Sequence, residues 1–102
     1  MFDNLEDFGL SSYEARVFYS MLKLGFSTAR EISNQSDVPF GRIYDVLGSL
    51  EDKELIEKQD SRPKRYALKE PKFAVNNLLL RKKKELDSLT DRAKNLEDHL
   101  AK

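Results

Sequence analysis

The last third of the chain predicts a single long helix. Neither glycine nor proline occurs in residues 72–101, and about 30 helical residues would extend roughly 45 Å. The rest of a small chain cannot wrap a helix of that length. The sequence therefore divides into residues 1–70, which must form the globular part, and residues 71–102, which form the helix.

Hydrophobic side chains recur along this helix at the a and d positions of a heptad, interrupted by Lys82. The stripe consists of Val75, Leu79, Leu86, Leu89, Ala93, Leu96 and Leu100. We expect it to pair with a second copy of the chain, which makes 71–102 the dimerisation helix of a homodimer. Leu78 and Leu80 are expected to pack back onto the globular part.

Two capping boxes mark the starts of two further helices. Ser11 and Glu14 are spaced so that each side chain can bond the other residue's backbone amide, at the start of a helix over about 12–24. Thr28 and Glu31 repeat this pattern at the start of a second, shorter helix. Both starts therefore follow from local sequence.

A third helix is predicted after a tight connection. Gly25 is expected to end the first helix in a left-handed conformation, and the second helix is expected to end near Ser36. Pro39 suits the start of the next helix, which hydrophobic residues at helical spacing extend over about 40–53. Two short helices joined by a turn match a helix-turn-helix.

A β-hairpin is predicted between the third helix and the long one. Residues 55–58 and 65–68 have the composition of short strands, and the residues between them favour a turn. Three helices followed by a hairpin is the order of a winged helix. The predicted fold is mainly α, an α+β winged helix with a three-helix core, a β-hairpin wing and a long C-terminal coiled-coil helix.

The first turns of the third helix carry candidate functional residues. In a helix-turn-helix, the second helix is the recognition helix, whose N-terminal residues reach base edges in the major groove of double-stranded DNA. Arg42 can donate two hydrogen bonds to guanine, and Gly41 lets the backbone approach closely. Phe40 either contacts a thymine methyl or packs beneath the turn. Tyr44 either bonds a phosphate or packs in the core.

Basic residues concentrate in the predicted wing, although the chain carries 18 acidic and 18 basic residues in total. Between residues 58 and 69, Asp60 is the single acidic residue among Lys58, Arg62, Lys64, Arg65 and Lys69. Such a wing suits the DNA backbone or minor groove, because phosphate contacts supply sequence-independent affinity. The start of the second helix can add phosphate contacts through its amides. The candidate contacts are Arg62, Lys64 and Arg65 in the wing, about 58–66, and Ser27, Thr28 and Arg30 at the helix start.

The composition argues against several other function classes. The chain has no cysteine and one histidine, His99, so the usual zinc ligand sets cannot form. It has no glycine-rich phosphate loop and no nucleophile–base motif. We therefore expect no enzyme activity, no metal and no cofactor. The N-terminus lacks the features of a signal peptide and no apolar run is long enough to span a membrane, which predicts a cytoplasmic protein.

Residues 5–72 resemble the DNA-binding domain of the archaeal TrmB-like transcriptional regulators. The similar segments are GLSSYEARVF, STAREIS, VPFGRIYDVLGSLEDKELIE and RPKRYAL. The resemblance implies a dimeric transcription factor that binds a pseudo-palindromic operator. Larger members carry a C-terminal sugar-binding domain. This chain leaves no room for one after the long helix, so it is either a naturally short member or a piece of a longer protein, and no small-molecule effector is evident.

The leading interpretation is a sequence-specific, homodimeric regulator that represses by occluding a promoter. Two alternatives stay open. A winged helix can instead be a protein–protein interaction module of the transcription machinery, and the neutral net charge permits this. The chain can also be a non-specific architectural DNA binder. A steep loss of DNA affinity with salt distinguishes both DNA binders from the protein-interaction module.

Overall fold

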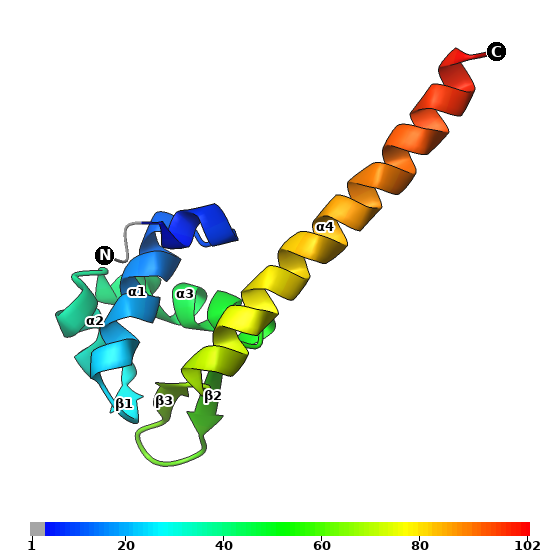
Figure 1. The fold of residues 1–102 in the computed structure, drawn as a ribbon. Helices are drawn as coiled ribbons and strands as arrows, with labels where there is room; N and C mark the ends of the chain where they lie inside the picture. The colour runs from blue at the N-terminus through cyan, green and yellow to red at the C-terminus, as the bar shows by residue number, and fades with distance from the viewer. Residues whose placement is uncertain (1–3) are drawn as a thin grey trace.

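The computed structural model describes residues 4–102, in which a small globular body carries one long projecting helix (Figure 1). The predicted helices, hairpin and long helix are all present, and a short 3₁₀ helix precedes them. The elements in chain order are η1 (Leu5–Phe8), α1 (Ser12–Lys23), β1 (Ser27–Thr28), α2 (Ala29–Ser36), α3 (Phe40–Asp52), β2 (Ile56–Gln59), β3 (Arg65–Leu68) and α4 (Pro71–Leu100).

One hydrophobic core joins the three short helices and the base of the hairpin. Each helix buries the face that its apolar spacing predicts, and α3 turns one side inward over three turns. The most buried members, each at most 3% exposed, are Val17, Phe18, Met21, Ile32, Val38, Ile43, Leu47, Leu50, Leu55, Ile56, Ala74 and Leu78. Burial on one side leaves the opposite side of α3 in solvent.

Both predicted capping boxes are confirmed. The Glu14 amide donates to Ser11 Oγ at 3.1 Å, and the Ser11 amide donates to Glu14 Oε1 at 2.8 Å. At the start of α2, the Glu31 amide donates to Thr28 Oγ1 at 3.2 Å and the Thr28 amide donates to Glu31 Oε1 at 3.0 Å. These local bonds begin α1 and α2 at the predicted residues.

The prediction that Gly25 ends α1 in a left-handed conformation is wrong. The helix ends at Lys23, and Leu24 follows with an extended backbone. Within residues 4–102, the positive φ angles belong to Gly9, Asp37 and Glu54. Three residues, 24–26, connect α1 to β1, and Gly25 among them does not adopt a left-handed conformation.

A third strand that sequence patterns did not reveal completes the sheet. The order is β1-β3-β2, with both pairs antiparallel. In β1, Ser27 pairs with Tyr66 and Thr28 pairs with Arg65. The predicted hairpin is confirmed, although its first strand starts at Ile56, one residue later than expected. The sheet therefore connects the wing to the start of α2.

A buried ion pair links the start of α1 to the end of α3. Lys53 Nζ lies 2.7 Å from Glu14 Oε1, and Ser49 Oγ donates to Glu14 Oε2 at 2.6 Å. Burial tends to raise the pKa of Glu14, but hydrogen bonds from Lys53, the Ser11 amide and Ser49, with the charge of Lys53, lower the pKa below its ordinary 4.5. The stabilisation is therefore present above about pH 4.5 and is lost as pH falls through the lower folded pKa.

Only the first turns of α4 pack on the body. The Glu70 carboxylate caps the helix by accepting from the amides of Lys72 and Phe73, and Leu78 is buried as predicted. The expectation for Leu80 is wrong, because it is 52% exposed. Two residues apart on a helix, the side chains of Leu78 and Leu80 point to nearly opposite sides.

We expect Lys53→Met to lower the free energy of unfolding by roughly 2–4 kcal/mol, because it leaves the buried Glu14 carboxylate without its counter-charge. Lys58→Met is the control. It breaks an exposed contact of 3.8 Å with Glu51 and should cost about 0–1 kcal/mol. Urea denaturation followed by circular dichroism measures both, and equal losses would show that the Glu14 pair does not hold α3 in place.

Candidate nucleic-acid interface

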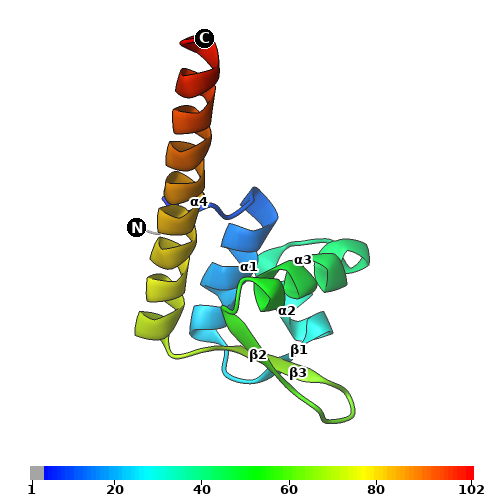
Figure 2. The ribbon, with the colours of Figure 1, turned by 90° about the vertical axis from the view of Figure 1, so that its right-hand side faces the viewer.

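The first turns of α3 and the wing loop lie on the same side of the body, away from α4 (Figure 2). The outermost line of α3 carries Gly41, Asp45 and Gly48, which follow one another at helical spacing on the exposed side. A Cβ placed at Gly41 would meet no atom within 4 Å. With glycine at two of its three positions, this line leaves the α3 backbone open to solvent. Asp45 contributes its one carboxylate.

Arg42 lies on the flank of this line that faces α1. Its guanidinium group is 5.8 Å from the centre of the Tyr13 ring, and that of Arg16 is 5.6 Å from the same ring. Arg16 also donates from Nε to Ser36 O at 3.1 Å and from Nη2 to Asp37 O at 2.8 Å. The arginine predicted to read guanine therefore rests beside an aromatic ring from another helix.

Arg30, Phe40 and Tyr44 form a cluster on the opposite flank, which faces α2. The Arg30 guanidinium group stacks 3.8 Å above the centre of the Phe40 ring. Phe40 and Tyr44 meet edge to face, with ring centres 5.7 Å apart. Tyr44 is 58% exposed. Of the two roles predicted for it, packing in the core is therefore wrong. Phe40 is half-buried and packs partly against the core.

Fewer side chains at the start of α2 are available to contact DNA than the sequence predicted. Ser27 is only 4% exposed and its hydroxyl donates to Gly25 O at 3.1 Å, so this side chain cannot reach a ligand. Ser27 is buried because β1 pairs with β3, which sequence patterns did not reveal. Hydrogen bonds from the Thr28 amide and hydroxyl, and the charge of Arg65, lower the pKa of Glu31 despite a slight opposing effect of burial. Glu31 is thus ionised at the start of α2.

The wing presents its basic residues to solvent. Arg62, Lys64 and Arg65 are all exposed, and Ser61 Oγ donates to Pro63 O at 2.8 Å within the loop. At the base, Tyr66 is buried, and burial together with nearby Tyr44 and Glu51 raises the pKa of its hydroxyl. Within residues 4–102, Arg62 and Lys64 at the tip therefore form no ion pair, while the base of the wing lies close to α3.

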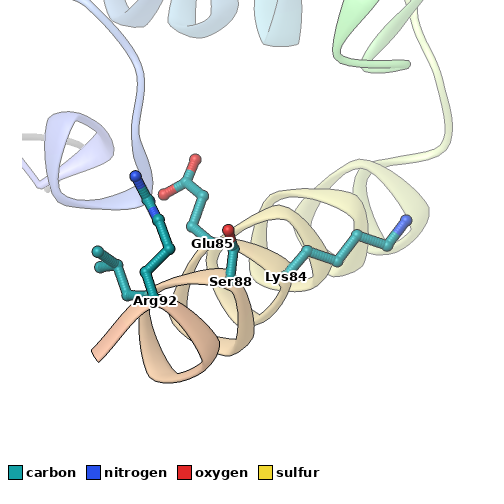
Figure 3. Close-up of a pocket in the computed structure, with 5 residues that line it drawn as sticks. Lys84, Glu85, Ser88 and Arg92 are labelled. Carbon is teal, nitrogen blue, oxygen red and sulfur yellow. The ribbon is translucent and has the colours of Figure 1, made fainter. Parts of the chain in front are cut away.

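The heptad stripe of α4 is exposed along its whole length. Its six larger members are between 42% and 75% exposed, and Ala93 is exposed as well. Lys82, which interrupts the stripe, extends its side chain toward Gly9, where an added Cβ would lie 3.4 Å from Lys82 Cε, and its Nζ lies 3.7 Å from Glu85 Oε2. Leu89 of the stripe borders a shallow hollow formed by α4 alone, together with Lys84, Glu85, Ser88 and Arg92 (Figure 3).

Residues 4–102 hold neither a metal-ligating cluster nor a membrane span. Nowhere in this range do three or more His, Cys, Asp or Glu side chains gather in a way that could hold a metal ion. Within the same range, no helix is long and apolar enough to cross a membrane.

Sequence reasoning missed Tyr13 and Arg16 as parts of this surface. Both belong to α1, and only the packing of α1 beside α3 brings them to Arg42. Their spacing of three residues places them on one face of α1, which was the one local signal available.

Residues 5–72 match the protein family described as "Sugar-specific transcriptional regulator TrmB". The chain is 36% identical over 74 residues to the sugar-sensing transcriptional regulator TrmBL1 of Pyrococcus furiosus, which covers 72% of this chain and 22% of that protein. It is 39% identical over 61 residues to the DNA-binding transcriptional repressor TrmBL2 of Thermococcus kodakarensis, covering 60% of this chain and 23% of that protein. The chain thus spans less than a quarter of these relatives' length.

The structure is also similar to a solved structure of TrmBL2, described as an archaeal chromatin protein with a novel mode of DNA binding. The TM-score is 0.83 at 28% identity, and the match covers 95% of this chain and 38% of that one. The similarity therefore extends beyond residues 5–72 into the long helix.

Proposed function

We propose, because the chain belongs to the TrmB family of transcriptional regulators, that it binds double-stranded DNA with the first turns of α3 in the major groove. One observation carries the proposal. The exposed N-terminal end of α3, flanked by Arg30 and Arg42, lies on the same side of the body as the basic wing loop (Figure 2). A duplex can meet both elements at once.

Each part of this surface suits a different part of a duplex. Arg42 can donate to guanine, and the open line at Gly41 allows the α3 backbone to approach base edges or phosphate. Arg62, Lys64 and Arg65 suit the adjacent backbone or minor groove, where they supply affinity without sequence preference. Asp45 repels phosphate, so it favours seating α3 where a base amino group can donate to it.

The family relationship and the exposed stripe of α4 support a homodimer. We propose that residues 1–70 form a winged helix-turn-helix domain. Residues 71–102 are then the helix through which two copies of the chain dimerise. Two domains related by two-fold symmetry would read a pseudo-palindromic operator with half-sites about one helical turn apart. Occupying such an operator in a promoter would repress transcription, the role named for the Thermococcus relative.

A second candidate function is architectural binding without strong sequence preference. The solved relative that covers nearly the whole of this chain is described as a chromatin protein. Both candidates predict a steep dependence of affinity on salt, because both rely on phosphate contacts. They differ in the ratio of specific to non-specific affinity.

Selection of bound duplexes from a random DNA pool at moderate salt tests the proposal. An inverted repeat with half-sites about one turn apart supports a sequence-specific dimer. Tight, salt-sensitive binding without enrichment supports the architectural function. Weak binding that salt does not change would contradict both and would favour a protein partner.

We expect Arg42→Ala to cost roughly 1–3 kcal/mol on the selected duplex and to relax preference at one base position. Lys94→Ala is the control, because it removes one positive charge from the exposed part of α4. Fluorescence anisotropy titrations measure both variants. If the two lose the same affinity, the assignment of α3 as the recognition helix is wrong.

Gly41→Ala is expected to affect folding stability and DNA affinity in opposite directions. We expect it to keep or raise stability by up to about 1 kcal/mol, because alanine favours a helix and has open space there. It should weaken DNA binding, because the added methyl group keeps the backbone away from the duplex. Gly48→Ala, on the same line two turns further along, should gain similar stability and cost less affinity. The reverse order would show that the middle of α3 enters the groove.

Leu89→Glu should dissociate the dimer, because it places a charge in the proposed α4 seam. Ser88→Glu adds the same charge outside the seam and should leave the dimer intact. Sedimentation velocity distinguishes dimer from monomer. A Leu89→Glu protein that stays dimeric would move the interface to another surface.

A further inference from the structure

Two arginines at the edges of the exposed α3 line each rest on an aromatic ring. Arg30 lies 3.8 Å above the centre of the Phe40 ring, and Arg42 lies 5.8 Å from the centre of the Tyr13 ring. Helix periodicity puts positions 40 and 42 on either side of Gly41. One stack therefore borders α2 and the other borders α1, with the open line of α3 between them.

Neither arginine is neutralised within the part of the chain that the structure describes. The ion pairs of residues 4–102 involve Glu14, Glu51 and Glu85, and none includes Arg30 or Arg42. Stacking on a ring uses the face of the planar guanidinium group and leaves its N–H donors free at the edge. Each guanidinium group thus lies over a ring, and among residues 4–102 its N–H donors are left available to a ligand.

The rings themselves are fixed by neighbouring residues. Tyr44 contacts the Phe40 ring edge to face. Arg16 approaches the Tyr13 ring at 5.6 Å and is tied to the carbonyl oxygens of Ser36 and Asp37 in the turn between α2 and α3. The Phe40 ring therefore belongs to the helix-turn-helix itself, and the Tyr13 ring belongs to α1, which packs beside it.

We propose that Phe40 and Tyr13 are positioning residues, each holding one arginine at one edge of α3 for an acceptor group of a DNA duplex. A side chain that is ordered before binding loses less conformational entropy when it binds. An exposed cation–π contact corresponds to roughly a two- to fivefold change in an equilibrium constant. The inference rests on the proposed function, and it gives Phe40 a role other than contact with a base.

Two double-mutant cycles on the full chain test this inference. One combines Tyr13→Leu with Arg42→Ala, and the other combines Phe40→Leu with Arg30→Ala. Dissociation constants are measured by fluorescence anisotropy on the selected duplex and, in parallel, on a mixed-sequence duplex of equal length. Circular dichroism checks that each variant folds. If a leucine variant does not fold, methionine is introduced at that position instead.

We expect each ring variant alone to weaken binding roughly two- to fivefold and to have no further effect once its own arginine is absent. The crossed pairs, Tyr13→Leu with Arg30→Ala and Phe40→Leu with Arg42→Ala, are matched controls and should be additive. Tyr13→Phe and Phe40→Tyr keep the rings and should bind like the unsubstituted protein. A merely structural role for the rings would weaken binding in every background alike.

Additive losses within each stack would overturn the inference, as would a Tyr13→Phe variant that loses as much affinity as Tyr13→Leu. Arginine variants that weaken binding while ring variants do not would overturn the inference and leave the proposed function intact. Arginine variants that change binding to neither duplex would overturn both.

Discussion

The contact between Lys53 and the buried Glu14 carboxylate joins the start of α1 to the end of α3. The arrangement of the other elements depends on this contact. Glu14 caps the start of α1, and Lys53 follows the last residue of α3. An unpaired carboxylate at this depth would be costly, so the pair specifies how α3 lies against α1. With its C-terminal end fixed and its apolar face buried, α3 must present its N-terminal turns to solvent.

The proposed DNA surface combines positive charge with acidic residues that oppose it. Arg30, Arg42 and the wing attract phosphate, whereas Asp45 and the ionised Glu31 repel it. Charges of both signs lower total affinity and penalise wrong placements of the duplex, which favours specificity over strength. Of the two proposed functions, this balance supports the sequence-specific regulator over the architectural binder.

The long helix would connect the body of the protein to its copy in the proposed dimer. Its first turns are attached to the body through Leu78 and the bond from Asn77 to Glu54 O at 2.9 Å. Further along, the stripe is exposed and could be covered only by another chain or by a segment outside the described residues. Because α4 is one straight element, a partner bound along it would set the distance between two copies of α3, and hence the spacing of half-sites.

Local sequence determined the four α-helices and the hairpin of this protein. The capping boxes at Ser11 and Thr28 set two helix starts, hydrophobic spacing set α3, and the absence of glycine and proline set α4. Each of these signals acts between residues a few positions apart, where backbone sterics and single hydrogen bonds suffice.

Only the tertiary structure decided what depends on distant residues coming together. The strand at Ser27 exists because β3 pairs with it, and the Ser27 side chain is buried there. Lys53 reaches Glu14, and Arg42 reaches Tyr13, because three helices share one core. Contacts of this kind depend on which faces pack together, and that choice follows from burying the whole hydrophobic core at once rather than from any local pattern.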